Sequence, residues 1–396
     1  MDKKLLHEHN AASESLSVRY HYLDNLRASA MLLGVFFHAS LAYSPFMQEL
    51  WLSADARNSV IADVFAWWVH LFRMPLFFLI AGFFCHYMFK KRGMLGLLKN
   101  RALRILLPFI LFLPLSIFYV IGLVSFAIEH TEISTPFVEF LVESGDEFSK
   151  RQDISTMHLW FLINLVFFYL VTALVYRLKK FHIIWQFIML RSKLFLLCFP
   201  LLLIPALLTQ TIPHPAPERI YPQLWSFGYF GVFFAMGWQF FNAQNWLDTI
   251  KPYWIPMLVF GILFYLFIFF NLPQSPTIAD AIKYSNQAPP LTIHHVLGVM
   301  AEAYCAIYWV LLALLLARQL WNREQKWMRY IADSSYWVYI MHIPAIFTVQ
   351  LQLTRVDWPI WIEYSISSFG VILIGILTYA VFVRKPPIGW MLNGRR

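Results

Sequence analysis

Charged residues are scarce in this chain of 396 residues, of which only 13% are Asp, Glu, Lys or Arg and 59% are hydrophobic. A soluble globular domain usually carries about 25% charged residues. Polar stretches long enough to bury a core of their own are also missing, which argues against an attached soluble domain. The scarcity of charge therefore points to a protein whose surface faces lipid.

Cysteines and several catalytic motifs are equally scarce. The chain has three cysteines, Cys85, Cys198 and Cys305, and each lies within an apolar run. Their number and spacing argue against a disulfide framework and predict buried thiols. The sequence lacks a phosphate-binding glycine-rich loop, a Gly-x-Ser-x-Gly nucleophile elbow and a His-Glu-x-x-His zinc site. His294 and His295 stand without further ligands, so no metal is predicted.

The N-terminus and the net charge exclude two further classes. Residues 1–22 lack the apolar stretch and small-residue cleavage site of a signal peptide, so none is expected. The net charge of +9 can indicate a nucleic-acid partner, but basic residues also collect in the cytoplasmic loops of membrane proteins. Because the apolar runs require a membrane, we prefer the second explanation and expect no nucleic-acid partner.

Apolar runs of roughly twenty residues fill most of the chain. A bilayer core of about 30 Å needs about twenty helical residues to cross it, and a helix satisfies its own backbone hydrogen bonds in lipid. The runs are approximately 23–43, 66–89, 105–128, 158–178, 194–212, 222–241, 252–272, 291–317, 332–350 and 360–383. They predict an all-α polytopic integral membrane protein with about ten transmembrane helices. The expected parts are an N-terminal segment at 1–22, a transmembrane domain at 23–383 and a tail at 384–396.

Lys and Arg divide unevenly between the two sets of loops. With the N-terminus in the cytoplasm, 23 of the 31 fall in cytoplasmic segments and six in external loops. Positive charge marks the cytoplasmic side of membrane proteins, so both termini are predicted to be cytoplasmic. The longest external loop, at about 129–157, is instead rich in Asp and Glu.

The first apolar run contains ionisable residues, which are rare and often functional inside a membrane. Asp24 lies three residues before Arg27, and His38 lies eleven residues after it. Arg27 and His38 therefore share one helix face about 16 Å apart, with His38 nearer the external side. Arg27 can bind a phosphate or carboxylate, and His38 can take a proton from a hydroxyl. The alternative is a structural Asp24–Arg27 pair and a core histidine with satisfied hydrogen bonds.

Two more basic groups follow. His70 and Arg73 are neighbours on the second run, with Arg73 expected near its external end. Arg73 can pair with an acidic residue or an anionic substrate group, or its head group can snorkel to the interface. Arg101 and Arg104 lie three residues apart at a cytoplasmic helix end. They can bind a nucleotide phosphate, or they simply mark the cytoplasmic side.

Polar residues also begin the fourth run and line the ninth. His158 and Trp160 open the fourth run at its external edge, where an interfacial aromatic belt explains Trp160 without function. Ser335, Tyr339 and His342 share one helix face through their i, i+4, i+7 spacing. They can line a polar pathway or form hydrogen bonds between helices.

Two acidic residues lie within apolar runs. Glu302 is in the eighth run and Glu363 is in the tenth. Either can be the partner of Arg73 or of a histidine, because buried charges need compensation. The spacing does not decide between these pairings.

Taken together, these residues resemble the membrane-bound acyltransferase 3 family over essentially the whole chain. Within it the chain is most similar to the glucan biosynthesis protein C group, the succinyltransferases of osmoregulated periplasmic glucans. The family more often has Ser at the position of Ala81, which weakens any hydrogen-bonding role there. The matching elements are Leu23-Asp24-x-x-Arg27 with ten residues before His38, Phe72-Arg73-Met74, Phe77 to Gly82, Arg101-x-x-Arg104 with Pro108, His158-Leu159-Trp160-Phe161, and Ser335-Tyr336 through His342-x-Pro344.

The resemblance implies an acyl-coenzyme A co-substrate on the cytoplasmic side of a bacterial inner membrane and no bound cofactor. It implies a hydroxyl of a periplasmic or envelope glycan as acceptor, succinyl as the favoured acyl group with acetyl as the alternative, and possible glycan-synthesis partners. Arg27 and His38 would be the essential pair, with Arg101 and Arg104 near the nucleotide phosphates of the donor. The other candidates for binding donor or acceptor are Asp24, His70, Arg73, His158, Trp160, Ser335, Tyr339 and His342.

Three functions of different classes remain open at this point. In an O-acyltransferase, His38 would act as general base or carry the acyl group transiently, and Arg27 would orient the donor or stabilise negative charge. In a transporter or flippase for an anionic or lipid-linked glycan, the same charges would line a pathway. The lack of an internal repeat counts mildly against transport. A structural partner of a glycan synthase would tolerate mutation of the polar face of the first run.

Overall fold

Apolar sequence forms helices throughout the described part of the chain, because a helix pairs its own backbone groups where water is absent. The computed structural model describes residues 20–130, 135–144, 155–177, 191–273, 276–384 and 388–393, and these contain helices and no strand. The all-α prediction is confirmed for these residues. Most of the predicted N-terminal segment, residues 1–19, and residues 385–387 and 394–396 of the tail lie outside the described residues.

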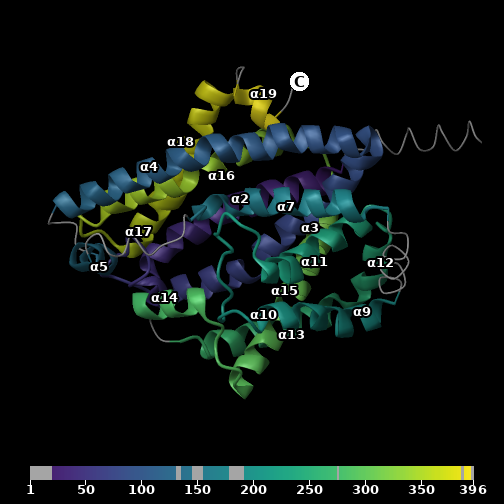
Figure 1. The fold of residues 1–396 in the computed structure, drawn as a ribbon, viewed down its shortest axis with the longest axis horizontal. Helices are drawn as coiled ribbons and strands as arrows, with labels where there is room; N and C mark the ends of the chain where they lie inside the picture. The colour runs from purple at the N-terminus through teal and green to yellow at the C-terminus, as the bar shows by residue number, and fades with distance from the viewer. Residues whose placement is uncertain are drawn as a thin grey trace, which may run out of the picture.

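The long helices pack together in one bundle (Figure 1). They are α2 (His21–Ser40), α3 (Val60–Arg101), α4 (Leu107–Glu129), α7 (Trp160–Val175), α11 (Leu224–Phe240), α13 (Trp254–Phe270), α15 (Ile293–Leu320) and α16 (Lys326–Leu353). Shorter helices are α5 (Pro136–Ser144), α9 (Ser192–Cys198), α10 (Ile204–Leu207), α12 (Trp246–Ile250), α14 (Ile278–Asn286), α17 (Ile360–Ser365), α18 (Val371–Thr378) and α19 (Ile388–Asn393). In Figure 1, α5 and α14 lie towards one end of the bundle and α12 lies towards the other.

Short 3-10 and π-helical turns connect or extend these helices. The 3-10 turns are η1 (Leu41–Tyr43), η2 (Pro45–Met47), η4 (Met157–Leu159), η5 (Phe199–Leu203) and η6 (Lys251–Tyr253). The π-helical turns are η3 (Ala102–Leu106), η7 (Ile366–Gly370) and η8 (Tyr379–Val383). Because η3 and η7 each continue directly from one helix into the next, and η8 extends α18, they lengthen the apolar segments rather than interrupt them.

Six segments of the described residues are long and apolar enough to cross a membrane. They are His21–Tyr43, Val60–Glu129, Met157–Val175, Trp246–Phe270, Ile293–Leu320 and Ile360–Val383. Val60–Glu129 alone is 70 residues long and covers two of the predicted spans. The remaining predicted spans fall on α9 with α10, on α11 and on α16, which are short or rich in polar residues. The helices therefore support a multi-pass membrane protein, and the count of ten crossings stays a prediction.

A kink at Gly93 divides α3 into two helical parts. Gly93 has φ 68° and ψ 176°, a conformation that only glycine adopts readily. A Cβ atom at this position would meet no heavy atom within 4 Å, so backbone conformation rather than space requires the glycine. Beyond Gly93 the helix continues through η3 into α4, and Arg101 and Arg104 lie on this continuous segment.

Helices α3 and α11 contact each other through their backbones at two glycines. A Cβ atom on Gly82 would lie 1.9 Å from the carbonyl oxygen of Phe234, and one on Gly237 would lie 1.8 Å from the carbonyl oxygen of Leu79. Small residues permit this close approach between membrane helices. The crossing fixes the position of α3, which carries several of the candidate site residues.

The cysteines confirm the sequence prediction only in part. Cys85 and Cys305 are buried free thiols, but Cys198 is exposed on α9. The prediction of a buried Cys198 is wrong because an apolar run in a membrane protein can face lipid as well as the protein core.

Gly237→Val is expected to disrupt the crossing of α3 and α11, because its side chain would occupy the position of the Leu79 carbonyl oxygen. Overpacking typically costs about 1–3 kcal/mol, and a backbone obstacle cannot rotate away. We expect a large loss of monodisperse protein in size-exclusion chromatography and a lower thermal midpoint. Gly122→Val on α4 is the matched control, since a Cβ atom there meets nothing within 4 Å. Equal profiles for the two variants would contradict the close crossing.

Candidate active site

Three histidines from separate segments lie together inside the bundle. His38 is in the last turn of α2, His158 is in η4 just before α7, and His342 is in the middle of α16. The ring centroid of His342 lies 4.9 Å from that of His38 and 5.1 Å from that of His158. The Nε2 atom of His342 is 3.0 Å from the Nδ1 atom of His38. We call these three residues the histidine cluster.

Backbone carbonyl groups orient two of the rings. The Nδ1 atom of His38 lies 2.8 Å from the carbonyl oxygen of Gly34, one turn earlier in α2. The Nδ1 atom of His342 lies 2.5 Å from the carbonyl oxygen of Tyr339. Each ring is therefore held through Nδ1 by its own helix, which leaves the Nε2 atoms to face other groups.

Hydrogen bonds join the start of α7 to α16. The Nε2 atom of His158 lies 2.9 Å from the carbonyl oxygen of Ile340, and the hydroxyl of Tyr339 donates to the carbonyl oxygen of His158 at 2.6 Å. Two of the three residues predicted to share a face of the ninth run, Tyr339 and His342, thus contact another segment. Ser335 instead donates to the carbonyl oxygen of Ala332 in its own helix, at 2.9 Å, and does not join the cluster.

Arg73 lies beside the histidine cluster and is only 5% exposed. Its guanidinium carbon is 4.4 Å from the ring centroid of Phe37, and its Nη1 atom is 3.1 Å from the position of a Cβ atom on Gly34. Arg73 is close enough to interact electrostatically with His38 and His342. The snorkelling alternative is wrong, because the space left by the missing side chain of Gly34 receives the guanidinium inside the bundle.

A second polar cluster also contacts Phe37. The ring of His70 stacks on Phe37 at 5.8 Å, and its Nε2 atom lies 2.8 Å from the carbonyl oxygen of His214. The ring and the backbone N–H of His214 both contact the carboxylate of Glu302, which is fully buried. The expectation that Glu302 pairs with a histidine is confirmed, and the histidine is His214.

Sequence reasoning did not select His214, because it belongs to a segment between two apolar runs. This segment, Pro213-His214-Pro215-Ala216-Pro217, folds back so that His214 is only 2% exposed. The available signal for a buried His214 was its place between two prolines in a segment with few charges. Prolines restrict the backbone and so favour one fixed conformation of such a loop.

Glu363, the other acidic residue, pairs with an arginine that was not predicted. Arg57 lies just before α3 and contacts Glu363 at 2.8 Å, Asp357 at 2.8 Å and Asp55 at 3.1 Å. The hydrogen bond with Asp55 raises the pKa of the Arg57 guanidinium, which remains charged. These contacts join the loop before α3 to α17 and to the loop that precedes it.

An aromatic ring from the same loop covers His38. The ring of Trp51 is nearly parallel to that of His38, with centroids 6.2 Å apart. The Nε1–H of Trp51 and the hydroxyl of Ser53 donate to the side-chain oxygen of Gln350, at 3.3 and 2.8 Å. Gln350 in turn donates to the carbonyl oxygen of Ala39 at 2.8 Å. This side of His38 is therefore closed by the loop.

Arginines gather at the other end of α2. The guanidinium carbon of Arg27 lies 5.6 Å from the ring centroid of Phe84, and Nη2 of Arg101 donates to the Phe84 carbonyl oxygen at 3.4 Å. Arg27 also pairs with Asp24 at 3.6 Å, as the spacing predicted. The guanidinium of Arg101 lies over the ring of Tyr169 at 5.2 Å. We call Arg27, Arg101 and the neighbouring Arg104 the arginine end.

Tyrosines on α16 connect the arginine end with the histidine cluster. The hydroxyl of Tyr336 donates to the carbonyl oxygen of Arg104 at 2.9 Å. The rings of Tyr336 and Tyr339 are nearly parallel, with centroids 6.4 Å apart. Along the continuous helix α2, eleven residues place His38 about 16 Å from Arg27. The two groups of polar residues are therefore separated along the bundle.

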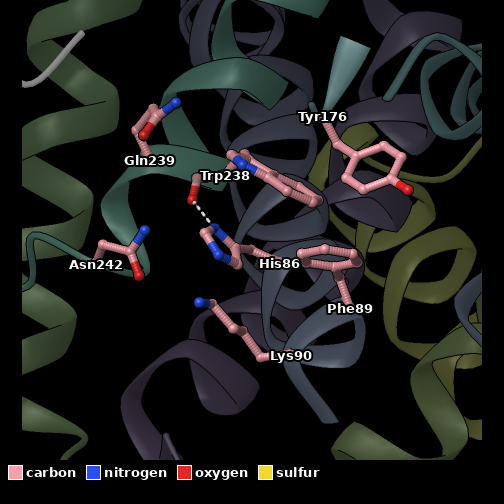
Figure 2. Close-up of a pocket in the computed structure, with 7 residues that line it drawn as sticks. All are labelled: His86, Phe89, Lys90, Tyr176, Trp238, Gln239 and Asn242. Carbon is pink, nitrogen blue, oxygen red and sulfur yellow. Dashed lines mark hydrogen bonds between the residues drawn. The ribbon is translucent and has the colours of Figure 1, made fainter. Parts of the chain in front are cut away.

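A cavity of about 250 Å³ is lined in part by residues that follow Phe84 and Tyr169 in the chain, the two aromatic residues that contact the arginine end (Figure 2). Tyr176 belongs to its wall and follows Tyr169 by two turns of the chain at the end of α7. The ring of His86 stacks on Trp238 at 4.3 Å, and its Nδ1 atom lies 2.7 Å from the Trp238 carbonyl oxygen, as Figure 2 shows. No sequence motif marked this cavity, because it is lined by residues of three distant segments. The lining residues are His86, Phe89, Lys90, Tyr176, Trp238, Gln239 and Asn242.

Trp160 is not part of an interfacial belt. It is 8% exposed, and its ring packs 6.0 Å from Phe78 and 5.2 Å from Phe230. The interfacial interpretation is wrong because the start of α7 is packed inside the bundle rather than at its lipid-facing surface. Trp160 supports the helix that follows His158, and none of its ring contacts within the described residues involves the histidine cluster.

The polar groups of the bundle offer bases and cations for chemistry. Within the described ranges, no group of three or more His, Cys, Asp or Glu side chains is arranged to hold a metal ion. The imidazoles of the histidine cluster carry nitrogen atoms that can accept and donate protons. The guanidinium groups can bind anions.

Comparisons with known proteins agree with these features. A family model described as an acyltransferase domain, that of the acyltransferase 3 family, matches residues 20–380. Relatives include the glucans biosynthesis protein C of Escherichia coli strain K12, of strain O81 ED1a and of strain O139:H28 E24377A. Each is 23% identical to this chain over 406 aligned residues, which cover 95% of both proteins. No solved structure matches the chain. Because the family model spans nearly all of the chain, the protein belongs to the acyltransferase 3 family and is a membrane acyltransferase.

Proposed function

We propose that this protein transfers a succinyl group from acyl-coenzyme A to a hydroxyl of a periplasmic glycan. The observation that carries the proposal is the separation of the arginine end from the histidine cluster within one bundle. In this proposal the chain crosses the bacterial inner membrane ten times with both termini in the cytoplasm. The arginine end then faces the cytoplasm, and His38 lies nearer the periplasm. The name of the relatives, glucans biosynthesis protein C, supports a glucan as the acceptor.

The arginine end suits a long anionic donor. Arg27, Arg101 and Arg104 would bind phosphate groups, which guanidinium groups recognise through paired N–H donors. The cavity offers aromatic rings, including Tyr176, on which a nucleotide base can stack. The thioester of the donor would then extend about 16 Å along α2 towards His38. At that distance Arg27 orients the donor and does not contact the reacting carbonyl.

Hydrogen bonding in the histidine cluster favours one tautomer for each of two rings. The Tyr339 carbonyl can only accept, so Nδ1 of His342 carries the proton and Nε2 is a bare acceptor in the neutral ring. The Gly34 carbonyl likewise places a proton on Nδ1 of His38, where it also faces Nε2 of His342. The Nε2 atom of His38 is then free to act as a base.

In the proposed reaction, Nε2 of His38 removes the proton from the acceptor hydroxyl while its oxygen attacks the thioester carbonyl carbon. The carbon–oxygen bond of the ester forms, the carbon–sulfur bond breaks, and the proton passes from His38 to the leaving thiolate. A positioned base of this kind contributes about 10²–10⁴-fold to the rate. His342 supports it by accepting the Nδ1–H of the charged His38 ring.

His38→Ala should abolish succinylation, because no other group replaces the base. Envelope glycans from wild type, a deletion strain and the deletion complemented with His38→Ala at matched membrane levels would be compared by mass spectrometry. We expect the succinyl mass increment in the wild type alone. His294→Ala, in an exposed histidine at the start of α15, is the control and should restore the increment.

Other outcomes of the same comparison would change the assignment. An acetyl increment that disappears in the same way would replace succinyl by acetyl. Glycans that keep every substituent but change in amount or location would favour transport and reject the proposal.

His342 is expected to act as a positioning residue, and two substitutions separate this role from simple packing. His342→Phe keeps a ring but loses the acceptor for Nδ1–H of His38, so kcat should fall by about tenfold or more with little change in KM for the donor. His342→Gln keeps an acceptor oxygen and should recover part of this loss. Steady-state kinetics on purified protein would test this, and equal kcat values for both variants would refute the positioning role.

A further inference from the structure

The Arg73 guanidinium is a buried cation without a compensating anion in the described part of the chain. Its Nε and Nη1 atoms are buried and have no hydrogen-bond partner there. None of the ion pairs found among the described residues includes Arg73. A charge in this position is costly to bury unless something pairs with it.

The groups around Arg73 do not supply that anion. On α2 it meets the backbone at Gly34 and the ring face of Phe37, which stabilises a cation only weakly. From α16, Tyr339 acts on it electrostatically, but its hydroxyl already donates to the carbonyl oxygen of His158. The nearest polar cluster places its carboxylate, Glu302, against His214. The free N–H groups therefore remain available to a ligand.

We infer that Arg73 binds a carboxylate at the far end of the transferred acyl group and thereby selects dicarboxylic half-thioesters such as succinyl-coenzyme A. The inference rests on the proposed function and assigns the acyl-group specificity of the same site. Two N–H donors of a guanidinium match the two oxygens of a carboxylate, and the pair is neutral overall. A neutral acyl group would leave the buried charge of Arg73 without an anionic partner.

The dimensions of the site agree with a four-carbon acyl group. Gly34, which marks the position of the guanidinium, lies one turn or about 6 Å before His38 on α2. Three carbon–carbon bonds of about 1.5 Å place the carboxyl carbon of a succinyl group about 4 Å from its thioester carbon. A hydrogen bond of about 3 Å completes the reach to Arg73 while the thioester carbon stays beside His38.

Other parts of the donor are less suitable partners for Arg73. The phosphate groups are assigned to the arginine end, which lies about 16 Å from His38 along α2. The thioester carbonyl oxygen reaches the histidine cluster but carries no full charge in the ground state. The acyl carboxylate is the group of the donor that combines full negative charge with this position.

Donor selectivity of the full chain in lipid nanodiscs tests the inference. The donors are succinyl-coenzyme A and butyryl-coenzyme A, which has the same number of acyl carbons and no carboxylate, and the acceptor is glucan from the deletion strain. For the wild type we expect kcat/KM to favour the succinyl donor by about 100-fold or more, the range in which an unmatched buried polar group discriminates. Arg73→Gln should bring the ratio close to one, mainly by loss of succinyl transfer. Arg73→Lys keeps the charge and should retain a reduced preference.

A second measurement remains informative if Arg73→Gln is inactive. Succinyl-coenzyme A should raise the thermal midpoint of the wild type more than butyryl-coenzyme A does, and Arg73→Gln should remove this difference. Arg329→Gln is the matched control, because Arg329 is exposed and pairs with Glu324. It should keep both the kinetic preference and the difference in midpoints.

The outcomes separate this inference from the proposed function. Transfer from neither donor by the wild type would refute the proposed function itself. Equal use of both donors, or a preference for butyryl, would overturn the role of Arg73 while acyl transfer stands. If Arg73→Gln lowers transfer from both donors equally and the midpoint difference persists, Arg73 acts on a group common to all donors and the inference fails.

Discussion

A polar group inside an apolar helix bundle must find its hydrogen-bond partner within the protein, because neither lipid nor apolar side chains can form the hydrogen bonds that water would form. This constraint shapes the described residues at several places. Glu302 is paired with His214, and Glu363 is paired with Arg57. Each pair joins a segment between helices to a helix that lies far away in the sequence. The loops of the bundle are therefore held in place by the same charged groups that would be most costly to bury without a partner.

Some exceptions to this constraint lie at the histidine cluster. Arg73 and Nδ1 of His158 are buried without partners in the described ranges, and both lie near His342. Unsatisfied groups weaken a folded protein, so their presence beside His342 agrees with a site that a substrate completes.

Sequence patterns predicted the helices well, because runs of about twenty apolar residues have few alternatives in a membrane. They also predicted the Asp24–Arg27 pair, which depends only on spacing within one helix. The contact between His38 and His342 could not be predicted in this way, since the two residues are 304 positions apart and meet only through helix packing. Both residues were candidates because each is a histidine within an apolar run. Only the three-dimensional structure shows that they contact each other.

The incorrect predictions have a common physical cause. In a soluble protein, polar and apolar faces alternate with helical periodicity and separate the core from the surface. In a membrane helix the lipid-facing surface is apolar too, so that signal is lost. An interfacial belt was one explanation for Trp160, which is buried, whereas Cys198 was expected in the core and is exposed. His214 was missed for the converse reason, because a loop was assumed to lie outside the bundle.

The separation of the arginine end from the histidine cluster has an energetic meaning for an acyltransferase. Binding energy from parts of a substrate that do not react can hold the reacting group in place. Phosphate groups bound near Arg27 and Arg101 would supply such energy far from the bond that breaks. In the proposed reaction, the groups near His38 would then act on the reacting atoms and on the acyl chain.

The backbone contact between α3 and α11 limits how this protein can vary. When two side chains touch, a larger residue on one helix can be accommodated by a smaller one on the other. At Gly82 and Gly237 the opposing atoms are the carbonyl oxygens of Phe234 and Leu79, and no substitution makes a carbonyl oxygen smaller. A compensating mutation at the point of contact therefore does not exist. Any suppressor of a larger residue at these glycines has to move a whole helix, and with α3 it would also move Arg73.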